Sequence, residues 1–177
     1  MITFICGGVR SGKTRFAERL LLASSCKNLH YVATGVVTDE EMKERVTRHQ
    51  QDRQRSERAW TTWEQPTDLH ELAFSSSDAV LIDCLTTWVT NEMMKHEKIP
   101  PGKLAKGLSK RLGKLLQQPG DLVIVSNDVS RGMPSSFTMV RDYIYLLGQM
   151  NQWLVKHSDQ AVEMVFGQPY FHKGVER

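Results

Sequence analysis

The chain has 177 residues, a length that suits one compact domain rather than two. Hydrophobic residues make up 40% of it and charged residues 24%, which is typical of an ordinary soluble globular protein. The formal net charge of +3 is too small to indicate a nucleic-acid partner, and 3 cysteines without C-x-x-C spacing argue against a disulfide framework or a zinc knuckle. No apolar stretch is long enough to span a bilayer and no basic leader precedes the first motif, so a cytoplasmic location is expected.

The first half of the chain alternates between short apolar runs and stretches with helical periodicity. The apolar runs predict strands over Ile2–Cys6, Leu29–Thr34 and Ala79–Asp83, and a short strand that stops at Pro66 is expected over Thr61–Glu64. One helix is expected from Thr14 to about Ser25, and a second from a capping box at Thr38 and Glu41 through Arg53.

The second half continues this alternation. Helices are expected over Leu85–His96, Leu104–Leu116 and Val140–His157, the second of them basic and amphipathic. Strands are expected over Asp121–Ser126 and Ala161–Phe166, and Ile99-Pro100-Pro101-Gly102 is the clearest loop. Strands that alternate with helices predict a single α/β domain over residues 1–177, with a mainly parallel sheet flanked by helices and right-handed crossovers.

The first expected strand leads into a phosphate-binding motif. The residues Gly7-Gly8-Val9-Arg10-Ser11-Gly12-Lys13-Thr14 fit the pattern G-x-x-x-x-G-K-[ST]. Glycines let the N–H groups of such a loop converge on phosphate oxygens, and the helix that follows adds its positive N-terminal end. Lys13 is expected to reach the β- and γ-phosphates and Thr14 to coordinate Mg²⁺. The motif predicts a P-loop NTPase fold of the RecA-like type that binds a nucleoside triphosphate, GTP or ATP.

A Mg²⁺ ion on a triphosphate usually needs a carboxylate at the end of a later buried strand. Asp83 follows the run Ala-Val-Leu-Ile, so it is the expected metal ligand beside Thr14. The alternative role for Asp83 is to cap the next helix. Asp121 precedes its strand instead of following it, so it is the poorer candidate.

A histidine lies in the second expected helix. Met42, Val46 and His49 are spaced at i, i+4 and i+7, so they share one helical face. Considered by itself, this pattern is more typical of a packed or partly exposed histidine than of a nucleophile. The arginines around it are equally typical of a solvated helix face.

Beyond the phosphate loop, five further blocks of sequence form a recognisable pattern. They are Tyr31-Val32-Ala33-Thr34, Arg45-Val46-Thr47-Arg48-His49-x-x-x-Arg53, Trp60-Thr61-Thr62-Trp63-Glu64-Gln65-Pro66, Leu81-Ile82-Asp83-Cys84-Leu85-Thr86-Thr87-Trp88 and Ser126-Asn127-Asp128-Val129. With these blocks most of the chain resembles the bifunctional adenosylcobinamide kinase / adenosylcobinamide-phosphate guanylyltransferase family of cobalamin biosynthesis. The Asp-Cys-Leu-Thr-x-Trp and Arg-x-x-x-His patterns are the most specific part of this resemblance.

The resemblance implies two reactions. In the first, the γ-phosphate of a nucleoside triphosphate passes to the hydroxyl of the aminopropanol arm of adenosylcobinamide. In the second, GTP gives GMP to His49, and the guanylyl group then passes to adenosylcobinamide phosphate to form adenosylcobinamide-GDP. A neutral imidazole is a good nucleophile near pH 7, and Lys13, Mg²⁺ and neighbouring arginines can stabilise the departing pyrophosphate.

The resemblance also implies which residues line the nucleotide outside the phosphate loop. These positions are Ala33, Thr34, Gly35, Gln50, Gln51, Asp52, Arg53, Glu64 and Asp83. Glu64 would read guanine, since a carboxylate can accept hydrogen bonds from N1–H and the exocyclic amine. The family forms a homotrimer, so the site is expected to be built across subunits. No nucleic-acid partner is expected.

One loop departs from the family pattern. Residues 127–134, Asn-Asp-Val-Ser-Arg-Gly-Met-Pro, stand where the family has the longer Asn-Glu-Val-Gly-x-Gly-Ile-Val-Pro. This leaves the nucleotide chemistry in place and leaves the corrinoid contacts open, including that of Asn127. Two other functions stay open as well: a P-loop small-molecule kinase in which His49 is dispensable, and a nucleotide-dependent regulator with little turnover.

Overall fold

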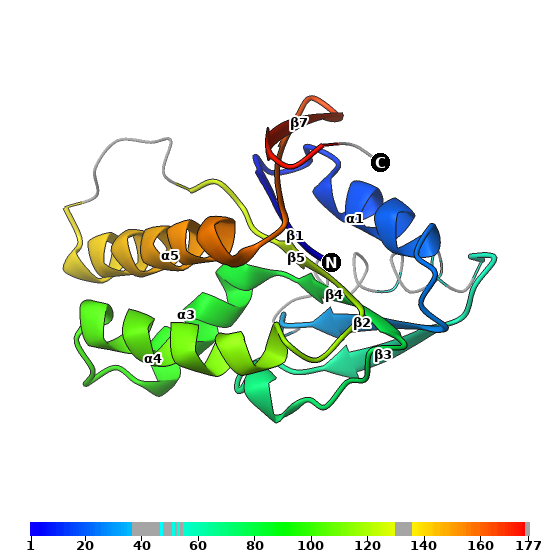
Figure 1. The fold of residues 1–177 in the computed structure, drawn as a ribbon. Coiled ribbons are helices and arrows are strands. Elements are labelled where there is room, and N and C mark those ends of the chain that lie inside the picture. Colours follow the sequence, from blue (N-terminus) through cyan, green and yellow to red (C-terminus); the bar gives the residue numbers. More distant parts are fainter. Residues whose placement is uncertain (37–46, 48–50, 52, 54, 130–135, 176–177) are drawn as a thin grey trace.

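The computed structural model of the chain describes residues 1–36, 47, 51, 53, 55–129 and 136–175 (Figure 1). One seven-stranded sheet organises them, in the spatial order β3-β2-β4-β5-β1-β6-β7. The strands are β1 Ile2–Gly7, β2 Asn28–Ala33, β3 Trp60–Glu64, β4 Asp78–Asp83, β5 Asp121–Val125, β6 Gln160–Val165 and β7 Gln168–Lys173. The helices are α1 Lys13–Leu22, α3 Leu85–Lys95, α4 Pro101–Leu115 and α5 Thr138–His157, with a short 3₁₀ helix, η1, at Leu69–Glu71.

The strands β1 to β6 all run parallel, and β7 is antiparallel to its neighbour β6. Parallel strands covered on both faces carry continuous apolar runs. In β4 the four residues Ala79, Val80, Leu81 and Ile82 have no exposed surface. The α/β fold with a mainly parallel sheet, which the alternating elements predict, is therefore confirmed.

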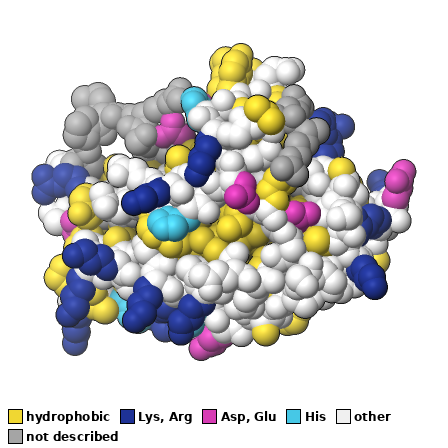
Figure 2. Space-filling view, in the orientation of Figure 1, with side chains coloured by type: hydrophobic (Ala, Val, Ile, Leu, Met, Phe, Trp, Pro, Cys, Tyr) yellow, Lys and Arg dark blue, Asp and Glu magenta, His cyan; other side chains and the backbone are white. Residues whose placement is uncertain are grey.

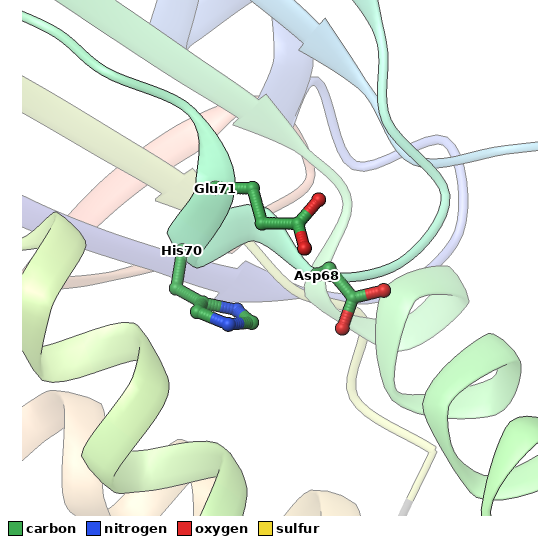
Figure 3. A group of neighbouring side chains, drawn as sticks. All are labelled: Asp68, His70 and Glu71. Carbon is green, nitrogen blue, oxygen red and sulfur yellow. The ribbon is translucent and has the colours of Figure 1, made fainter.

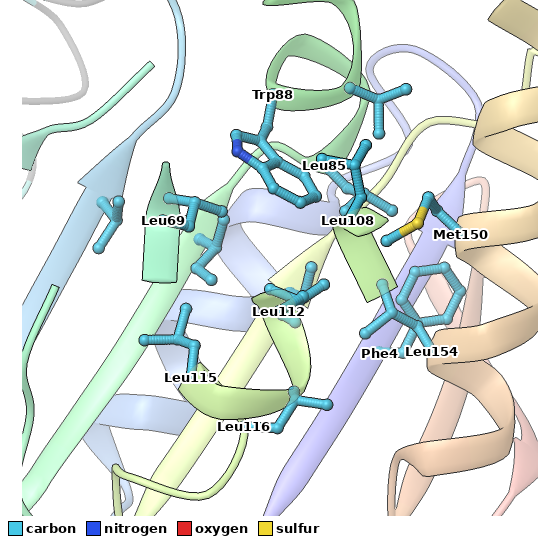
Figure 4. Packing of buried hydrophobic residues seen from close by; sticks show 14 of the residues in the cluster. Phe4, Leu69, Leu85, Trp88, Leu108, Leu112, Leu115, Leu116, Met150 and Leu154 are labelled. Carbon is cyan, nitrogen blue, oxygen red and sulfur yellow. The ribbon is translucent and has the colours of Figure 1, made fainter. Parts of the chain in front are cut away.

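Helices cover both faces of the sheet (Figure 1). Phe16 and Leu21 of α1 join an apolar cluster with residues of β4 and β5 on one face. On the other face α3, α4 and α5 enclose a larger cluster around Trp88, which is 1% exposed. In Figure 4, Leu108 of α4 and Leu154 of α5 lie within this same cluster. No helix among the described residues combines the length and the apolar character needed to cross a membrane.

The helix α4 is amphipathic, as its sequence predicts. Its buried residues recur at helical spacing and are Leu104, Ala105, Leu108, Leu112 and Leu115. Figure 2 shows Lys and Arg side chains along the rim of the molecule over α4. The helix begins at Pro101, inside the segment expected as a loop. Proline suits the first helical position because its missing N–H would have no partner there and its φ angle is already helical.

The strand β7 and the helix η1 are absent from the sequence prediction, which ends the sheet at Phe166. The chain instead turns back after β6 through Phe166 and Gly167, whose φ angles are 50° and 84°. Two central residues with positive φ make the tight turn that matches the twist of a β-hairpin. Pro169 disguises β7 in the sequence, but an edge strand tolerates a proline because one side of its backbone needs no partner.

The carboxyl ends of the parallel strands meet at one edge of the sheet. In the register, Ala33 at the end of β2 pairs with both Glu64 at the end of β3 and Asp83 at the end of β4. Gly7 ends β1 at the same edge. Open α/β sheets bind ligands at this edge, so the fold itself brings these candidate residues to one side of the molecule.

Candidate nucleotide site

The phosphate loop, Gly7–Thr14, joins β1 to α1 and depends on its glycines. A Cβ atom on Gly7 would lie 2.5 Å from the carbonyl oxygen of Met164 in β6, so no side chain fits there. Gly12 adopts a φ of 90° as the residue before α1. Val9 and Arg10 are exposed on the loop. The residue before α1 makes no side-chain cap hydrogen bond, and a helix N-terminus of this kind is suited to an anion.

The ammonium group of Lys13 is held by the loop itself. Its Nζ donates to the carbonyl oxygen of Gly7 at 2.9 Å and to that of Gly8, and Ser11 Oγ lies 3.4 Å away. The residue is only 7% exposed. Burying a cation is costly unless it is hydrogen-bonded, so the carbonyls stabilise it in a position from which phosphate oxygens could take their place.

Asp83 meets the start of α1 across the sheet edge. Thr14 Oγ1 donates to Asp83 Oδ2 at 3.1 Å, and the Tyr31 hydroxyl donates to the same oxygen at 2.8 Å. Burial, followed by the neighbouring Asp83 charge, raises the pKa of Tyr31 well above its usual range, so the phenol stays protonated and donates. The helix α3 has no side-chain cap hydrogen bond, so the capping role considered for Asp83 is not observed. Asp121 starts β5 and accepts from Ser24, away from this edge.

Arg53 is buried against Tyr31 and near Glu18 instead of extending into solvent. Its guanidinium carbon lies 3.6 Å from the centroid of the Tyr31 ring, and its Nη1 lies 3.6 Å from Glu18 Oε1 of α1. The residue is 6% exposed. A cation over an aromatic face is attracted by the ring's negative quadrupole. Arg53 therefore contacts α1 and β2 from within the protein, next to the residue that bonds Asp83.

The other expected nucleotide residues at this edge differ in exposure. Glu64 is exposed at the end of the edge strand β3, whereas Ala33 and Gly35 are half-buried. Thr34 has no exposed surface, and its hydroxyl is bonded to the backbone of Cys84. A nucleotide at this edge would meet the Glu64 carboxylate freely, whereas the Thr34 side chain is already engaged.

Several residues expected in the site lie outside the described residues. His49, Gln50 and Asp52 are among them, as is the capping box at Thr38 and Glu41. Gln51 is described, and it is helical and exposed.

A polar cluster follows Asp83 that the sequence alone does not indicate. The Cys84 thiol lies 2.7 Å from Thr86 Oγ1 and 3.1 Å from Thr87 Oγ1. Asn127, which follows β5, donates to Thr86 Oγ1 at 3.1 Å. In the sequence Cys84 lies between Asp83 and Leu85, and a single cysteine beside a buried strand is typical of a core thiol. Only the dense hydroxyl content of the Asp-Cys-Leu-Thr-Thr block could have hinted at a polar site.

A second group of potential metal ligands is better explained by ion pairing. Asp68, His70 and Glu71 around η1 are the group of carboxylates and histidines that lie close enough to share an ion within the described part of the chain (Figure 3). However, Asp68 pairs with Lys95, and its other oxygen lies 3.3 Å from Arg111 Nη1. The hydrogen bond from Lys95 lowers the pKa of Asp68 despite partial burial. These cations already neutralise the carboxylate.

A large groove lies elsewhere on the surface. It has a volume of about 1150 Å³ between α4 and α5, and Lys106, Lys110, Tyr145 and Trp153 are among the residues that line it. No residue of the phosphate loop lines this groove. The candidate site is thus identified by the chemistry of its residues and by its position at the carboxyl ends of the strands, not by the volume of a cavity.

The fold and the loop together define a P-loop nucleotide-binding protein with a RecA-like α/β sheet. A solved structure of a prototypical ATPase from the type III secretion system of pathogenic bacteria superposes with a TM-score of 0.56 at 11% identity. The match covers 99% of this chain and 58% of that chain. At this identity the likeness concerns the fold alone.

The comparison with protein families is more specific. The family described as cobinamide kinase / cobinamide phosphate guanyltransferase matches residues 3–171, and the chain belongs to that family. The bifunctional adenosylcobalamin biosynthesis protein CobP of Pseudomonas aeruginosa is 33% identical, over 98% of both chains. CobU of Escherichia coli, with the same description, is 28% identical over 94% of this chain and 97% of its own. The chain is a bifunctional cobinamide kinase and cobinamide phosphate guanylyltransferase of cobalamin biosynthesis.

Proposed function

We propose that one nucleotide site, formed at the phosphate loop Gly7–Thr14, serves both reactions of this enzyme. In the kinase step the acceptor is adenosylcobinamide and the donor is ATP or GTP. In the second step GTP donates GMP through a guanylyl-histidine at His49 to adenosylcobinamide phosphate. The chain works as a homotrimer, as the family resemblance implies. Light scattering of the purified protein would measure its oligomeric state.

One observation carries the proposal: the hydrogen bond between Thr14 and Asp83, 3.1 Å long. It brings a hydroxyl from the start of α1 and a carboxylate from the end of β4 together beside Lys13. Hard oxygen donors of this kind are those that Mg²⁺ prefers, so the residues fit a magnesium–nucleotide complex. Bound there, Mg²⁺ would neutralise charge on the phosphate oxygens.

In the kinase step the chain positions the γ-phosphate for attack. The hydroxyl oxygen of the aminopropanol arm attacks the γ-phosphorus, the bond to the bridging oxygen breaks, and the nucleoside diphosphate leaves as the hydroxyl proton is released. Lys13 and the loop N–H groups stabilise the charge that develops on the phosphate oxygens. Little else is required, because catalysis of phosphoryl transfer rests mostly on positioning and electrostatics.

In the guanylyl step the acceptor is first a protein residue. A nitrogen of the neutral His49 imidazole attacks the α-phosphorus of GTP, and pyrophosphate leaves. A phosphate oxygen of adenosylcobinamide phosphate then attacks the same phosphorus and the P–N bond breaks, which restores the imidazole. Lys13, which is expected to contact the β- and γ-phosphates, would stabilise the departing pyrophosphate.

The proposal is tested by following two labels in one reaction. The enzyme is incubated with adenosylcobinamide, Mg²⁺ and GTP labelled at either the α- or the γ-phosphate. We expect γ-label in adenosylcobinamide phosphate and α-label in adenosylcobinamide-GDP, with α-label appearing transiently on the protein. α-Label on the corrinoid without any α-label on the protein would reject the covalent intermediate.

Replacing Glu64 with glutamine is expected to weaken the use of GTP without affecting ATP. Glu64 is exposed at the carboxyl end of β3, and guanine offers two N–H donors to a carboxylate. Losing a hydrogen bond to a charged acceptor should raise the KM for GTP in guanylyl transfer by about 10- to 100-fold. The ATP-dependent kinase rate should be unchanged, and Glu97→Gln, in a loop after α3, serves as the control. Equal loss with both nucleotides would exclude guanine recognition by Glu64.

A further inference from the structure

Thr34 is attached to the backbone around Asp83 by three hydrogen bonds. Its N–H donates to the carbonyl oxygen of Asp83 at 3.1 Å. Its hydroxyl donates to the carbonyl oxygen of Cys84 at 2.7 Å and accepts from the Cys84 N–H at 2.8 Å. Thr34 itself has no exposed surface.

These hydrogen bonds continue the link between β2 and β4 beyond the last paired residues of the two strands. The last paired residues of β2 and β4 are Ala33 and Asp83. One residue further on, the hydroxyl of Thr34 satisfies both polar backbone groups of Cys84, which a hydroxyl can do because it donates and accepts at once. Without it, the Cys84 N–H would lose its partner, whereas the Cys84 carbonyl oxygen would keep the Trp88 N–H at 3.1 Å, and buried backbone N–H groups are rarely left unpaired. The hydroxyl therefore fixes the direction in which the chain leaves β4.

A second side chain fixes Thr34 in turn. Asn91 of α3 donates through its Nδ2 to the carbonyl oxygen of Thr34 at 2.9 Å and to that of Pro66 at 3.0 Å. The loops after β2 and β3 are thus tied to the same helix that follows Asp83. This leaves Thr34 little freedom to turn its hydroxyl toward a nucleotide.

We infer that Thr34 is a positioning residue, whose hydroxyl holds the Asp83 carboxylate in the orientation needed to take Mg²⁺ beside Thr14. This inference rests on the proposed role of Asp83. Residues that orient a metal ligand without touching the metal typically change metal affinity when replaced. Thr34 therefore acts on the metal through the backbone of residues 83 and 84, not by contact with the nucleotide.

The test measures how strongly Mg²⁺ tightens nucleotide binding. The affinity of a fluorescent GTP analogue is titrated with and without Mg²⁺ for the wild type, Thr34→Val and Thr34→Ser, with Thr62→Val on the exposed face of β3 as the matched control. Thr34→Val should lose about 10- to 100-fold of the Mg²⁺-dependent gain, while the Mg²⁺-free affinity stays near that of the wild type. Thr34→Ser keeps the hydroxyl and should retain the gain, as should Thr62→Val.

Four results would overturn the inference. The first is an equal loss of affinity with and without Mg²⁺ in Thr34→Val, which indicates a general defect of the site. The second is loss of the gain in Thr34→Ser, a measurement that remains decisive where Thr34→Val does not fold. The third concerns Asp83→Asn: if it keeps the full Mg²⁺ gain, the proposed metal site fails and the inference with it. If Asp83→Asn loses the gain and Thr34→Val keeps it, only the inference about Thr34 fails.

Discussion

Replacing His49 with asparagine is expected to abolish covalent guanylylation and leave the kinase step running. Asparagine has no nucleophilic nitrogen, so no phosphoramidate can form at this position. Guanylyl transfer should fall by about 10³-fold or more, the scale seen when a covalent nucleophile is removed. The measurement is protein-bound radioactivity after incubation with α-labelled GTP, which should be acid-labile and base-stable in the wild type and absent in the variant.

A control variant must show that replacing a different histidine leaves the covalent labelling unchanged. His157 lies at the end of α5, and its ring bonds the carbonyl oxygen of Trp153. His157→Asn should label like the wild type. Formation of adenosylcobinamide phosphate should also continue in His49→Asn, because the γ-phosphoryl group passes directly to its acceptor. Retained labelling in His49→Asn would move the nucleophile to another residue.

The sequence predicts the parts of this fold that local patterns control. The expected strands match β1 to β6 to within a residue or two, and apolar runs locate the central ones because a buried parallel strand needs apolar residues on both faces. The sequence does not indicate the hairpin to β7, because its turn is built from Phe166 and Gly167, and only the glycine is an expected turn residue. The early start of α4 at Pro101 was missed because the same residue type marks both loops and first turns of helices.

The same distinction between local patterns and long-range contacts applies to the residues of the candidate site. The phosphate loop follows from a contiguous motif, and Asp83 follows from its place at the end of a buried strand. Tyr31 and the Thr34 hydroxyl could not be assigned their contacts in this way, because their partners lie about fifty positions away in the chain, where only the strand order brings them close. The strands β2 and β4 become neighbours only in the folded sheet, and hydrophobic periodicity along the sequence does not indicate which strands lie side by side.

Replacing Lys13 with methionine is expected to reduce both activities, in contrast to His49→Asn. Methionine keeps an unbranched side chain of similar length and removes the ammonium group. That group now bonds the carbonyls of Gly7 and Gly8, and in the complex it would stabilise charge on the phosphates. Losing one such donor costs about 10² to 10³ in rate, and the loss should appear in both the γ- and the α-label assays.

The pattern across the two variants decides whether one nucleotide site is used twice. Loss of both reactions in Lys13→Met, with loss of only one in His49→Asn, requires the same loop to hold the donor for both. If Lys13→Met kept the α-label on the protein while losing γ-transfer, the GTP that guanylylates the enzyme would have to bind elsewhere. Lys27→Met, at an exposed position just before β2, controls for the loss of a positive charge, and circular dichroism controls for the fold. The Gly7–Thr14 loop alone indicates only a triphosphate, and the α- and γ-label assays on this pair of variants would show whether it holds the donor for both reactions.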